Sequence, residues 1–196
     1  MTAETATPTV FEDVEHGYRA VFPNTVRANT NQVFEAQIED RRTGQMIDSP
    51  DVTKAVHGRC GYAVALIACV THLTLLDHKQ PNLARLRTDP DARVQFMAEP
   101  FHNMLWMPRF WHERGTARPD DITFAVEMAE HFSMGDHPAT RLIGEAQVYG
   151  ETLPIALTLI LRGNEGLVLL AVDHAGQGWA TDAARAFNGE FALLDR

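Results

Sequence analysis

The chain has 196 residues, of which 45% are hydrophobic and 22% are charged. This length and composition are typical of a globular protein that buries one core, and they exclude a disordered chain. The formal net charge of −9 repels the phosphate backbone of nucleic acids, so we expect no nucleic-acid partner.

The chain is expected to fold as one unit behind a short tail. Residues 1–10 are small, polar and rich in threonine, which is typical of a flexible tail. Residues 11–196 contain no internal repeat and are predicted to form a single globular domain. Only two of the 17 basic residues are lysines, and this preference for arginine indicates a bacterial source with a GC-rich genome.

The sequence predicts a cytoplasmic protein that does not cross a membrane. The first residues lack the basic and then apolar pattern of a secretory signal. The longest apolar run, residues 62–76, is shorter than the ~20 residues that a membrane helix needs. Two cysteines are too few for a disulfide scaffold or for a four-cysteine zinc site.

The first predicted elements are two short strands. Apolar and polar side chains alternate over residues 33–39, which is typical of a half-buried strand. Residues 40–44 predict a turn because they are polar and end in glycine. A short partner strand is expected to follow this turn.

The dominant predicted element is a long helix over residues 50–78. Ser49 can cap it, and Pro50 suits its first position. From Tyr62 onward the segment is apolar nearly all round, so we expect this helix to be central. The helical spacing is carried by Val52, Val56, Cys60, Ala63, Ile67 and Val70.

The middle of the chain gives weaker signals. Residues 92–99 are compatible with a strand, while residues 119–132 have an acidic first turn and predict a short helix. Between them, residues 101–115 are apolar and aromatic and are interrupted by Pro108.

The last third of the chain predicts mostly strands. Residues 141–150 alternate, and residues 152–174 form two apolar runs joined by the turn residues 163–166, which predicts a hairpin. Thr181 is expected to cap a short helix, and residues 190–195 predict a last strand. The predicted fold class is therefore α+β: a mainly antiparallel sheet packed against one long central helix, with shorter flanking helices.

Cys60 is the first candidate for chemistry. If Gly58 and Gly61 break the long helix, the helix dipole and Arg59 favour a reactive thiolate at Cys60. His174 ends a predicted central strand and is the best candidate base, and Asp173 or Asp195 could orient it. This order of residues resembles the layout of papain-like thiol hydrolases, although no family signature surrounds the cysteine or the histidine. The resemblance implies a thiol-dependent hydrolase or acyltransferase.

A structural role for Cys60 is the favoured alternative. Cys60 already lies on the apolar stripe, and free cysteine is among the most buried residue types. The two glycines then allow close packing against the sheet. On one continuous helix Cys60 and Cys69 are about 13 Å apart, too far for a disulfide.

A group of histidines suggests a weaker metal hypothesis. His131, Asp136 and His137 lie close together in sequence, and imidazole and carboxylate groups suit zinc or iron. No HExxH spacing is present, and the sequence of residues 136–138 is also typical of a turn. We therefore predict no cofactor and no metal.

The aromatic and methionine-rich segment of residues 101–112 is the favoured binding surface. Tryptophan, methionine and arginine supply much of the energy at binding patches. The alternative is a loop that closes the end of the core. We therefore expect a non-catalytic binding or assembly protein that contacts a protein partner or itself, and a small-molecule ligand remains open. The predicted contact residues are Trp106, Met107, Arg109, Phe110, Trp111 and Arg114.

Overall fold

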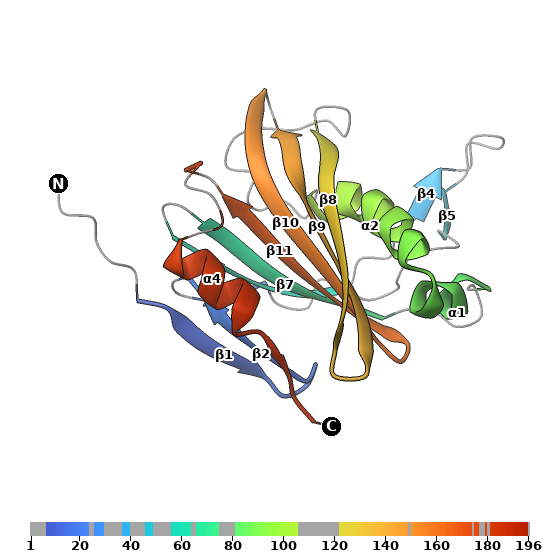
Figure 1. Ribbon diagram of the computed structural model, residues 1–196, viewed down its shortest axis with the longest axis horizontal. Helices are drawn as coiled ribbons and strands as arrows, with labels where there is room; N and C mark the ends of the chain where they lie inside the picture. Colours follow the sequence, from blue (N-terminus) through green and yellow to red (C-terminus); the bar gives the residue numbers. More distant parts are fainter. Residues whose placement is uncertain are drawn as a thin grey trace.

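A seven-stranded antiparallel sheet forms the centre of the molecule (Figure 1). The computed structural model describes residues 7–23, 26–29, 37–39, 46–48, 56–63, 66–74, 81–105, 122–148, 150–173, 175–176, 179 and 181–195. In spatial order the strands are β3 (Val26–Asn29), β6 (Val56–Tyr62), β7 (Leu66–Thr74), β11 (Glu165–Asp173), β10 (Glu151–Arg162), β9 (His137–Val148) and β8 (Ile122–Met134).

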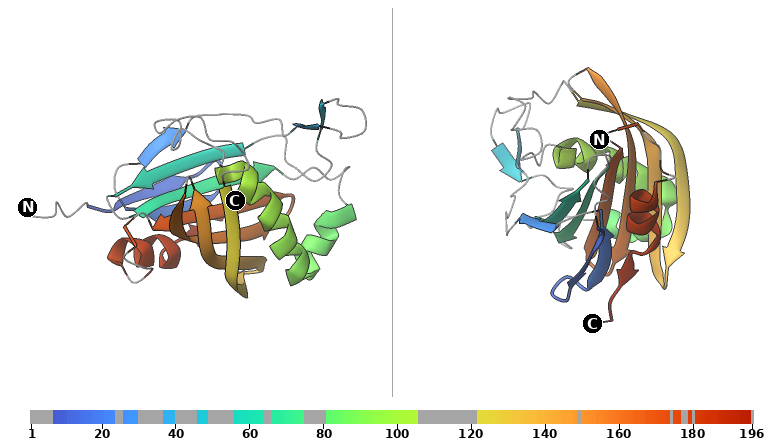
Figure 2. Two further views of the ribbon diagram at one scale, coloured as in Figure 1. Left: turned by 90° about the horizontal axis from the view of Figure 1, so that it is seen from above. Right: turned by 90° about the vertical axis from the view of Figure 1, so that its left-hand side faces the viewer.

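Smaller elements surround this sheet. The first strand of the chain begins at Thr9, inside the stretch expected to be a tail. Figure 2 shows that the long strands of the main sheet curve. No helix within the described ranges is long and apolar enough to span a membrane. The additional elements are a three-stranded sheet of β1 (Thr9–Asp13), β2 (Tyr18–Phe22) and β12 (Ala192–Leu193), the pair β4 (Gln37–Glu39) and β5 (Met46–Asp48), and the helices α1 (Pro81–Thr88), α2 (Pro90–Leu105) and α4 (Asp182–Gly189).

The helix predicted over residues 50–78 is wrong. Residues 56–62 and 66–74 instead form the antiparallel strands β6 and β7. The predicted α+β class with one long central helix is therefore corrected to a mostly β fold. The physical reason is that β7 is buried on both faces, so its apolar run does not alternate. Periodicity alone cannot distinguish such a strand from a buried helix.

Two smaller assignments in the middle of the chain are also wrong. Residues 92–99 lie within α2 and are not a strand. Residues 122–132, expected to be helical, belong to β8, which pairs with β9 along its length. Pairing with a neighbouring strand overrides local propensity in such a segment, because β propensity depends strongly on context.

The C-terminal predictions are confirmed. Strands β10 and β11 form the expected hairpin, in which Arg162 pairs with Glu165 and Gly163 has a φ of 60°. Thr181 caps α4 by accepting a hydrogen bond from the backbone N–H of Ala184, and the expected last strand is β12. The predicted strand pair near residue 40 is present as β4 and β5.

The main sheet carries a separate apolar core on each face. Successive side chains of a strand point to opposite faces. In β10, Leu157 and Leu159 join the cluster that contains the residues of α1 and α2, whereas Ala156 and Ile160 join the cluster of β2 and α4. We call the first side the helix face and the second the hairpin face. In Figure 1, α1 and α2 lie on the opposite side of the main sheet from α4, β1 and β2.

Gly61 lets the two layers of the hairpin face approach closely. A Cβ atom added at Gly61 would lie 2.9 Å from the Cβ of Phe22, which is closer than real Cβ contacts allow. Phe22 is fully buried and packs against Phe187 of α4, with 5.7 Å between the ring centroids. The β1–β2 hairpin is therefore seated directly on the main sheet.

Candidate functional site

Cys60 lies in strand β6, directly opposite Cys69 of β7. Their Cα atoms are 4.1 Å apart, and their sulfur atoms form a disulfide. The expectation that the two residues are too far apart for a bridge is wrong because it assumed a helix. Cys60 stands within a strand and not at the start of a helix, and because its sulfur is in the disulfide it carries no free thiol.

The partners predicted for Cys60 are only partly described. His174, the candidate base, lies outside the described residues. Asp173 is buried at the end of β11, where its carboxylate accepts a hydrogen bond from the backbone N–H of Ala175 at 3.2 Å. Asp195 is exposed near the end of the chain. Of the three predicted partners the structure therefore describes only the two aspartates, while Cys60 itself is held in the disulfide.

The histidines of the metal hypothesis lie on the hairpin of β8 and β9. His131 is in β8, and its ring Nδ1 lies 3.1 Å from the hydroxyl of Thr140. Asp136 is in the turn, and His137 begins β9. Within the described ranges, no group of three or more histidine, cysteine or acidic side chains is arranged to hold a metal ion.

The predicted contact residues Trp106, Met107, Arg109, Phe110, Trp111 and Arg114 lie outside the described residues. Their binding role stays a prediction. The start of the same segment, up to Leu105, is the last turn of α2.

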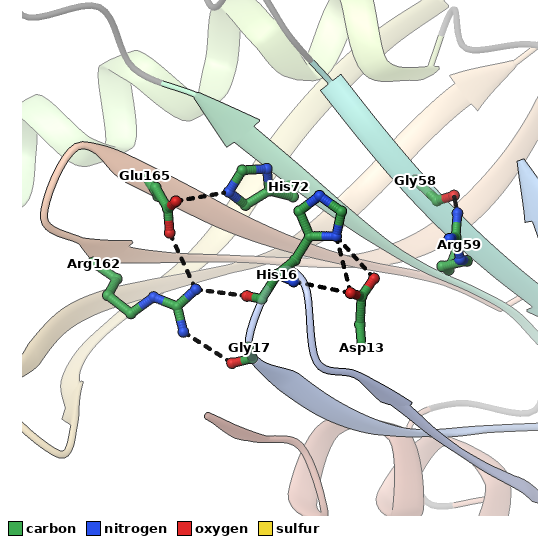
Figure 3. Close-up of polar contacts among 8 residues, drawn as sticks. All are labelled: Asp13, His16, Gly17, Gly58, Arg59, His72, Arg162 and Glu165. Atoms are coloured by element: carbon green, nitrogen blue, oxygen red, sulfur yellow. Dashed lines mark hydrogen bonds and ion pairs between the residues drawn. The ribbon is translucent and has the colours of Figure 1, made fainter. Parts of the chain in front are cut away.

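A polar cluster joins the β1–β2 turn to the main sheet (Figure 3). Asp13, His16 and His72 are buried in it, whereas Arg162 and Glu165 are partly buried. The first contacts of the cluster join residues that are close in the sequence. Asp13 ends β1, and its carboxylate accepts a hydrogen bond from the backbone N–H of His16 at 2.9 Å. The same carboxylate lies 3.0 Å from Nδ1 of the His16 ring. Gly17 has a φ of 62°, which a glycine adopts without strain, and so the chain can turn into β2.

Arg162 connects this turn to the β10–β11 hairpin. Its guanidinium donates hydrogen bonds to the backbone carbonyls of His16, at 2.5 Å, and Gly17, at 2.9 Å. It also pairs with the carboxylate of Glu165, three residues later, at 3.1 Å. A planar guanidinium suits this task because it presents several donors in fixed directions.

His72 completes the cluster from strand β7. Its Nε2 lies 3.5 Å from the carboxylate of Glu165, and its ring centroid lies 4.5 Å from that of His16. The side chains of Val70 and Ala68 belong to the core of the hairpin face, and His72 continues this alternating row at the end of the strand. The cluster therefore closes the end of the hairpin-face core.

The electrostatics of the cluster favour an ionised Asp13 and a neutral Tyr18. Burial by itself raises the pKa of Asp13, but the hydrogen bonds from His16 and the positive charge of Arg59 lower it below its usual value. Burial raises the pKa of Tyr18, and the negative charge of Asp13 raises it further. The stabilisation from Asp13 is present above about pH 4, the unfolded value, and is lost as the pH falls through the folded pKa.

This arrangement can fasten one layer of the protein to another. It links the β1–β2 turn with β7, β10 and β11 through side chains that are distant in the sequence. Sequence reasoning missed the cluster. The one local signal was the spacing of Arg162 and Glu165 across a predicted turn, which favours an ion pair between facing strand residues.

The comparisons with known proteins concern the fold. No protein-family model and no curated protein sequence matches the chain. Cyanobacterial PsbP (CyanoP) from Synechocystis sp. PCC 6803 has a similar solved structure, with a TM-score of 0.53 and 15% identity over 99% of this chain and 96% of that one. The solved structure of PA94, a protein of unknown function from Pseudomonas aeruginosa, matches with a TM-score of 0.37 and 13% sequence identity over 76% of this chain and 85% of that one. The structure of LpqN from Mycobacterium tuberculosis, a protein involved in cell envelope biogenesis, matches with a TM-score of 0.41 and 13% sequence identity over 96% of this chain and 91% of that one. The chain therefore has a fold similar to that of CyanoP.

Proposed function

We propose that the protein is a non-catalytic binding or assembly protein that engages a partner protein along strand β8. The observation that carries this proposal is the exposure of seven consecutive β8 residues, 125–131. Two of them are large and apolar: Val126 is 41% exposed and Met128 is 46% exposed. The central strands β7, β10 and β11 are instead buried on both faces.

Strand β8 also offers backbone groups to a partner. It is the last strand in the order of the main sheet and, among the described strands, pairs only with β9. An edge strand presents backbone N–H and C=O groups that an extended segment of another protein can pair with. The exposed apolar side chains then supply contact area beside these hydrogen bonds.

The charge of β8 indicates what kind of partner fits. The strand carries Glu127 and Glu130, both exposed, and its sequence contains no lysine or arginine. The carboxylate of Glu130 also lies 3.7 Å from the guanidinium of Arg141 in β9, which leaves Glu127 as the stronger charge for a partner. A second copy paired through the same strand would bring acidic residues together, in a chain whose net charge is already −9. We therefore propose an extended, basic segment of a different protein as the occupant.

The segment predicted to bind lies next to this edge in the chain. Residues 106–121 connect the end of α2 to the start of β8. Phe96 of α2 and Phe124 of β8 pack against the same core cluster on the helix face, so the two elements that flank the segment are neighbours. This continuity supports a joint contact surface of β8 and residues 101–112. The fold likeness to CyanoP agrees with a scaffold role but identifies no partner.

A crosslinking experiment tests the proposal. A photoreactive amino acid at position 128 should capture one partner protein in the source cells, while the same group at Arg185, an exposed residue of α4, should not. With the captured partner purified, Glu127→Lys together with Glu130→Lys should weaken binding at least about tenfold, because two favourable charge contacts become repulsive. Capture of the same proteins at both positions, or unchanged affinity of the double variant, would contradict the proposal.

The predicted contact residues need a separate measurement. Trp106→Ala and Trp111→Ala should weaken the same complex while the thermal unfolding midpoint stays unchanged. Trp179→Ala is the matched control, because Trp179 packs against the hairpin-face core and its loss should lower that midpoint. If Trp106→Ala or Trp111→Ala unfolds the protein instead, that segment belongs to the core. A concentration-dependent dimer in sedimentation experiments would favour a second copy as the occupant.

The cytoplasmic location stays a prediction, and the disulfide offers a test of it. Disulfides persist chiefly in oxidising compartments. Alkylation in cells lysed directly into denaturant should label Cys60 and Cys69 if the protein resides in the cytoplasm, because both residues are buried in the folded chain and become accessible only on unfolding. Protection of both sulfur atoms would indicate an oxidising location.

A further inference from the structure

A hydrogen-bonded relay of three side chains runs from helix α2 through strand β9 to strand β8. Arg93 of α2 donates a hydrogen bond from Nε to the hydroxyl of Thr140 in β9, at 2.7 Å. The same hydroxyl oxygen lies 3.1 Å from ring Nδ1 of His131 in β8. Arg93 and Thr140 are 4% and 0% exposed, whereas His131 is exposed. A buried pair of side chains therefore holds one edge of an exposed ring within the surface proposed for β8.

The direction of both hydrogen bonds follows from the groups that take part. A guanidinium can only donate, so the hydroxyl oxygen of Thr140 accepts from Arg93. Thr140 is sealed from water, and a buried hydroxyl proton without an acceptor is costly. Among the polar contacts of Thr140 within the described residues, only Nδ1 of His131 can accept that proton. The hydroxyl therefore donates to Nδ1, and this nitrogen carries no proton in the neutral ring.

The first member of the relay is itself held in place. Nη1 of Arg93 donates to the backbone carbonyls of Leu86, at 2.9 Å, and Arg87, at 3.4 Å, which both lie in the last turn of α1. Thr140 lies in β9, which pairs with β8 on one side and with β10 on the other. Its branched side chain also has few rotamers available. The hydroxyl that faces His131 is therefore fixed before any partner binds.

We propose that Arg93 and Thr140 are positioning residues that hold neutral His131 with its proton on Nε2, and that this N–H donates a hydrogen bond to the partner segment at β8. The inference rests on the proposed function and deepens it, because it names one contact that recognises the partner. The two nitrogens of an imidazole point in different directions, so Nε2 faces away from Thr140 when Nδ1 contacts it. Within the described part of the chain, Nε2 has no hydrogen-bond partner.

The fixed tautomer restricts the chemistry of the group that His131 contacts. Nε2–H can only donate, so it selects an acceptor oxygen and disfavours a second donor. Side chains directly opposite each other in paired strands interact, so the acceptor belongs to the side chain that a paired segment places opposite His131. The exposed carboxylates of Glu127 and Glu130 repel an acidic side chain at this place. The partner is therefore a basic segment with an asparagine, glutamine, serine or threonine facing His131.

Nitrogen NMR of the free protein tests the tautomer without a partner. At about pH 8.5, where histidine rings are ordinarily neutral, Nδ1 of His131 should resonate as an unprotonated nitrogen and Nε2 as a protonated one. Their separation should exceed that of a histidine that exchanges between tautomers. Thr140→Ser keeps the hydroxyl and should preserve the separation, whereas Thr140→Val should narrow it. A proton on Nδ1 would overturn the assignment, and the wild-type spectrum decides this even if Thr140→Val is unstable.

Peptide selection on the immobilised wild-type protein tests the contact. From a display library of random peptides rich in lysine and arginine, those captured by a photoreactive group at position 128 should share an amide or hydroxyl side chain at one position. His131→Phe keeps a flat ring but removes the donor, and it should weaken these peptides about three- to tenfold. His137→Phe is the matched control, because His137 begins β9 outside the relay, and it should bind them as the wild type does.

The outcomes separate this inference from the surface on which it rests. If no peptide is captured at position 128, the surface proposed for β8 is wrong, and the role of His131 is wrong with it. If peptides are captured there without the shared amide or hydroxyl, or if His131→Phe binds them as tightly as the wild type, the surface stands and the role of His131 is refuted.

Discussion

The two faces of the main sheet are built from the same strands but end in different chemistry. In β7, Cys69 and Leu73 join the core of the helix face, while Val70 joins the core of the hairpin face. Close to the strand end the helix face stays apolar, whereas the hairpin face ends in His72 and its polar partners. The comparison shows that the end of β7 borders the helix-face core with a leucine and the hairpin-face core with ionisable groups.

This difference bears on how each covering layer is held. On the helix face, α1 and α2 pack mainly through apolar side chains such as Leu83, Leu86 and Met97, and apolar contacts have little directional preference. The buried guanidinium of Arg93 in α2 adds one hydrogen bond to the sheet, to the hydroxyl of Thr140 in β9 at 2.7 Å. On the hairpin face, Arg162 holds the β1–β2 turn through two specific backbone hydrogen bonds. We infer that the polar cluster sets the position of the hairpin layer more than its stability, because buried charges contribute modestly to net stability.

The largest loss of stability is expected when a large side chain is removed from the hairpin-face core. Phe22→Ala removes a fully buried ring that contacts Gly61, and we expect it to lower the free energy of unfolding by about 3–5 kcal/mol. Leu159→Ala, on the helix face, should cost about 2–5 kcal/mol by the same mechanism. Urea unfolding measures both. A loss below about 1 kcal/mol for Phe22→Ala would mean that the hairpin is not seated on the sheet.

The next effect concerns the disulfide on the helix face. Replacing both Cys60 and Cys69 by alanine should lower the free energy of unfolding by about 2–4 kcal/mol, towards the lower end because the two cysteines are only nine positions apart and close a short loop. The native protein should also resist iodoacetamide, and its intact mass should be lower by two hydrogens than that of the reduced chain. Rapid alkylation of Cys60 in the native protein would instead revive the nucleophile hypothesis.

The smallest expected loss of stability comes from a comparison of two glycines in β6, one on each face of the main sheet. Gly61→Ala, on the hairpin face, forces a Cβ against Phe22, and we expect a loss of about 1–3 kcal/mol in unfolding free energy. Gly58→Ala is the control in the same strand, where a Cβ would meet the hydroxyl of Thr71 at an ordinary 3.7 Å. Equal effects of the two substitutions would show that neither glycine is required for layer contact.

Local signals predicted the C-terminal third of the fold well. The β10–β11 hairpin follows from turn residues at 163–166, and α4 follows from a threonine cap at Thr181. Both features are encoded within a few adjacent residues. The helix predicted for residues 50–78 failed because Ser49 and Pro50 suggested a helix start and the later run was apolar on every side. Only its pairing with β11 and β6 makes residues 66–74 a strand.

The candidate site could not be predicted from the sequence. His16 and His72 meet because the β1–β2 hairpin packs on β7, and no motif links two residues so far apart. The disulfide was missed for the same reason, since Cys60 and Cys69 face each other only once both are assigned to paired strands. Contacts between distant elements depend on topology, which a single sequence does not display.

The pairing of β2 with β12 has a consequence for how the protein is made. Leu193 pairs with Tyr18, and α4 of the same C-terminal region covers Phe22. During synthesis on the ribosome, the hairpin of β1 and β2 emerges early, whereas α4 and β12, which pack on it and pair with it, emerge only after residues 23–181 have been made. In that interval its aromatic side chains are available to chaperones, and the layer can be completed only after translation of the C-terminal strand.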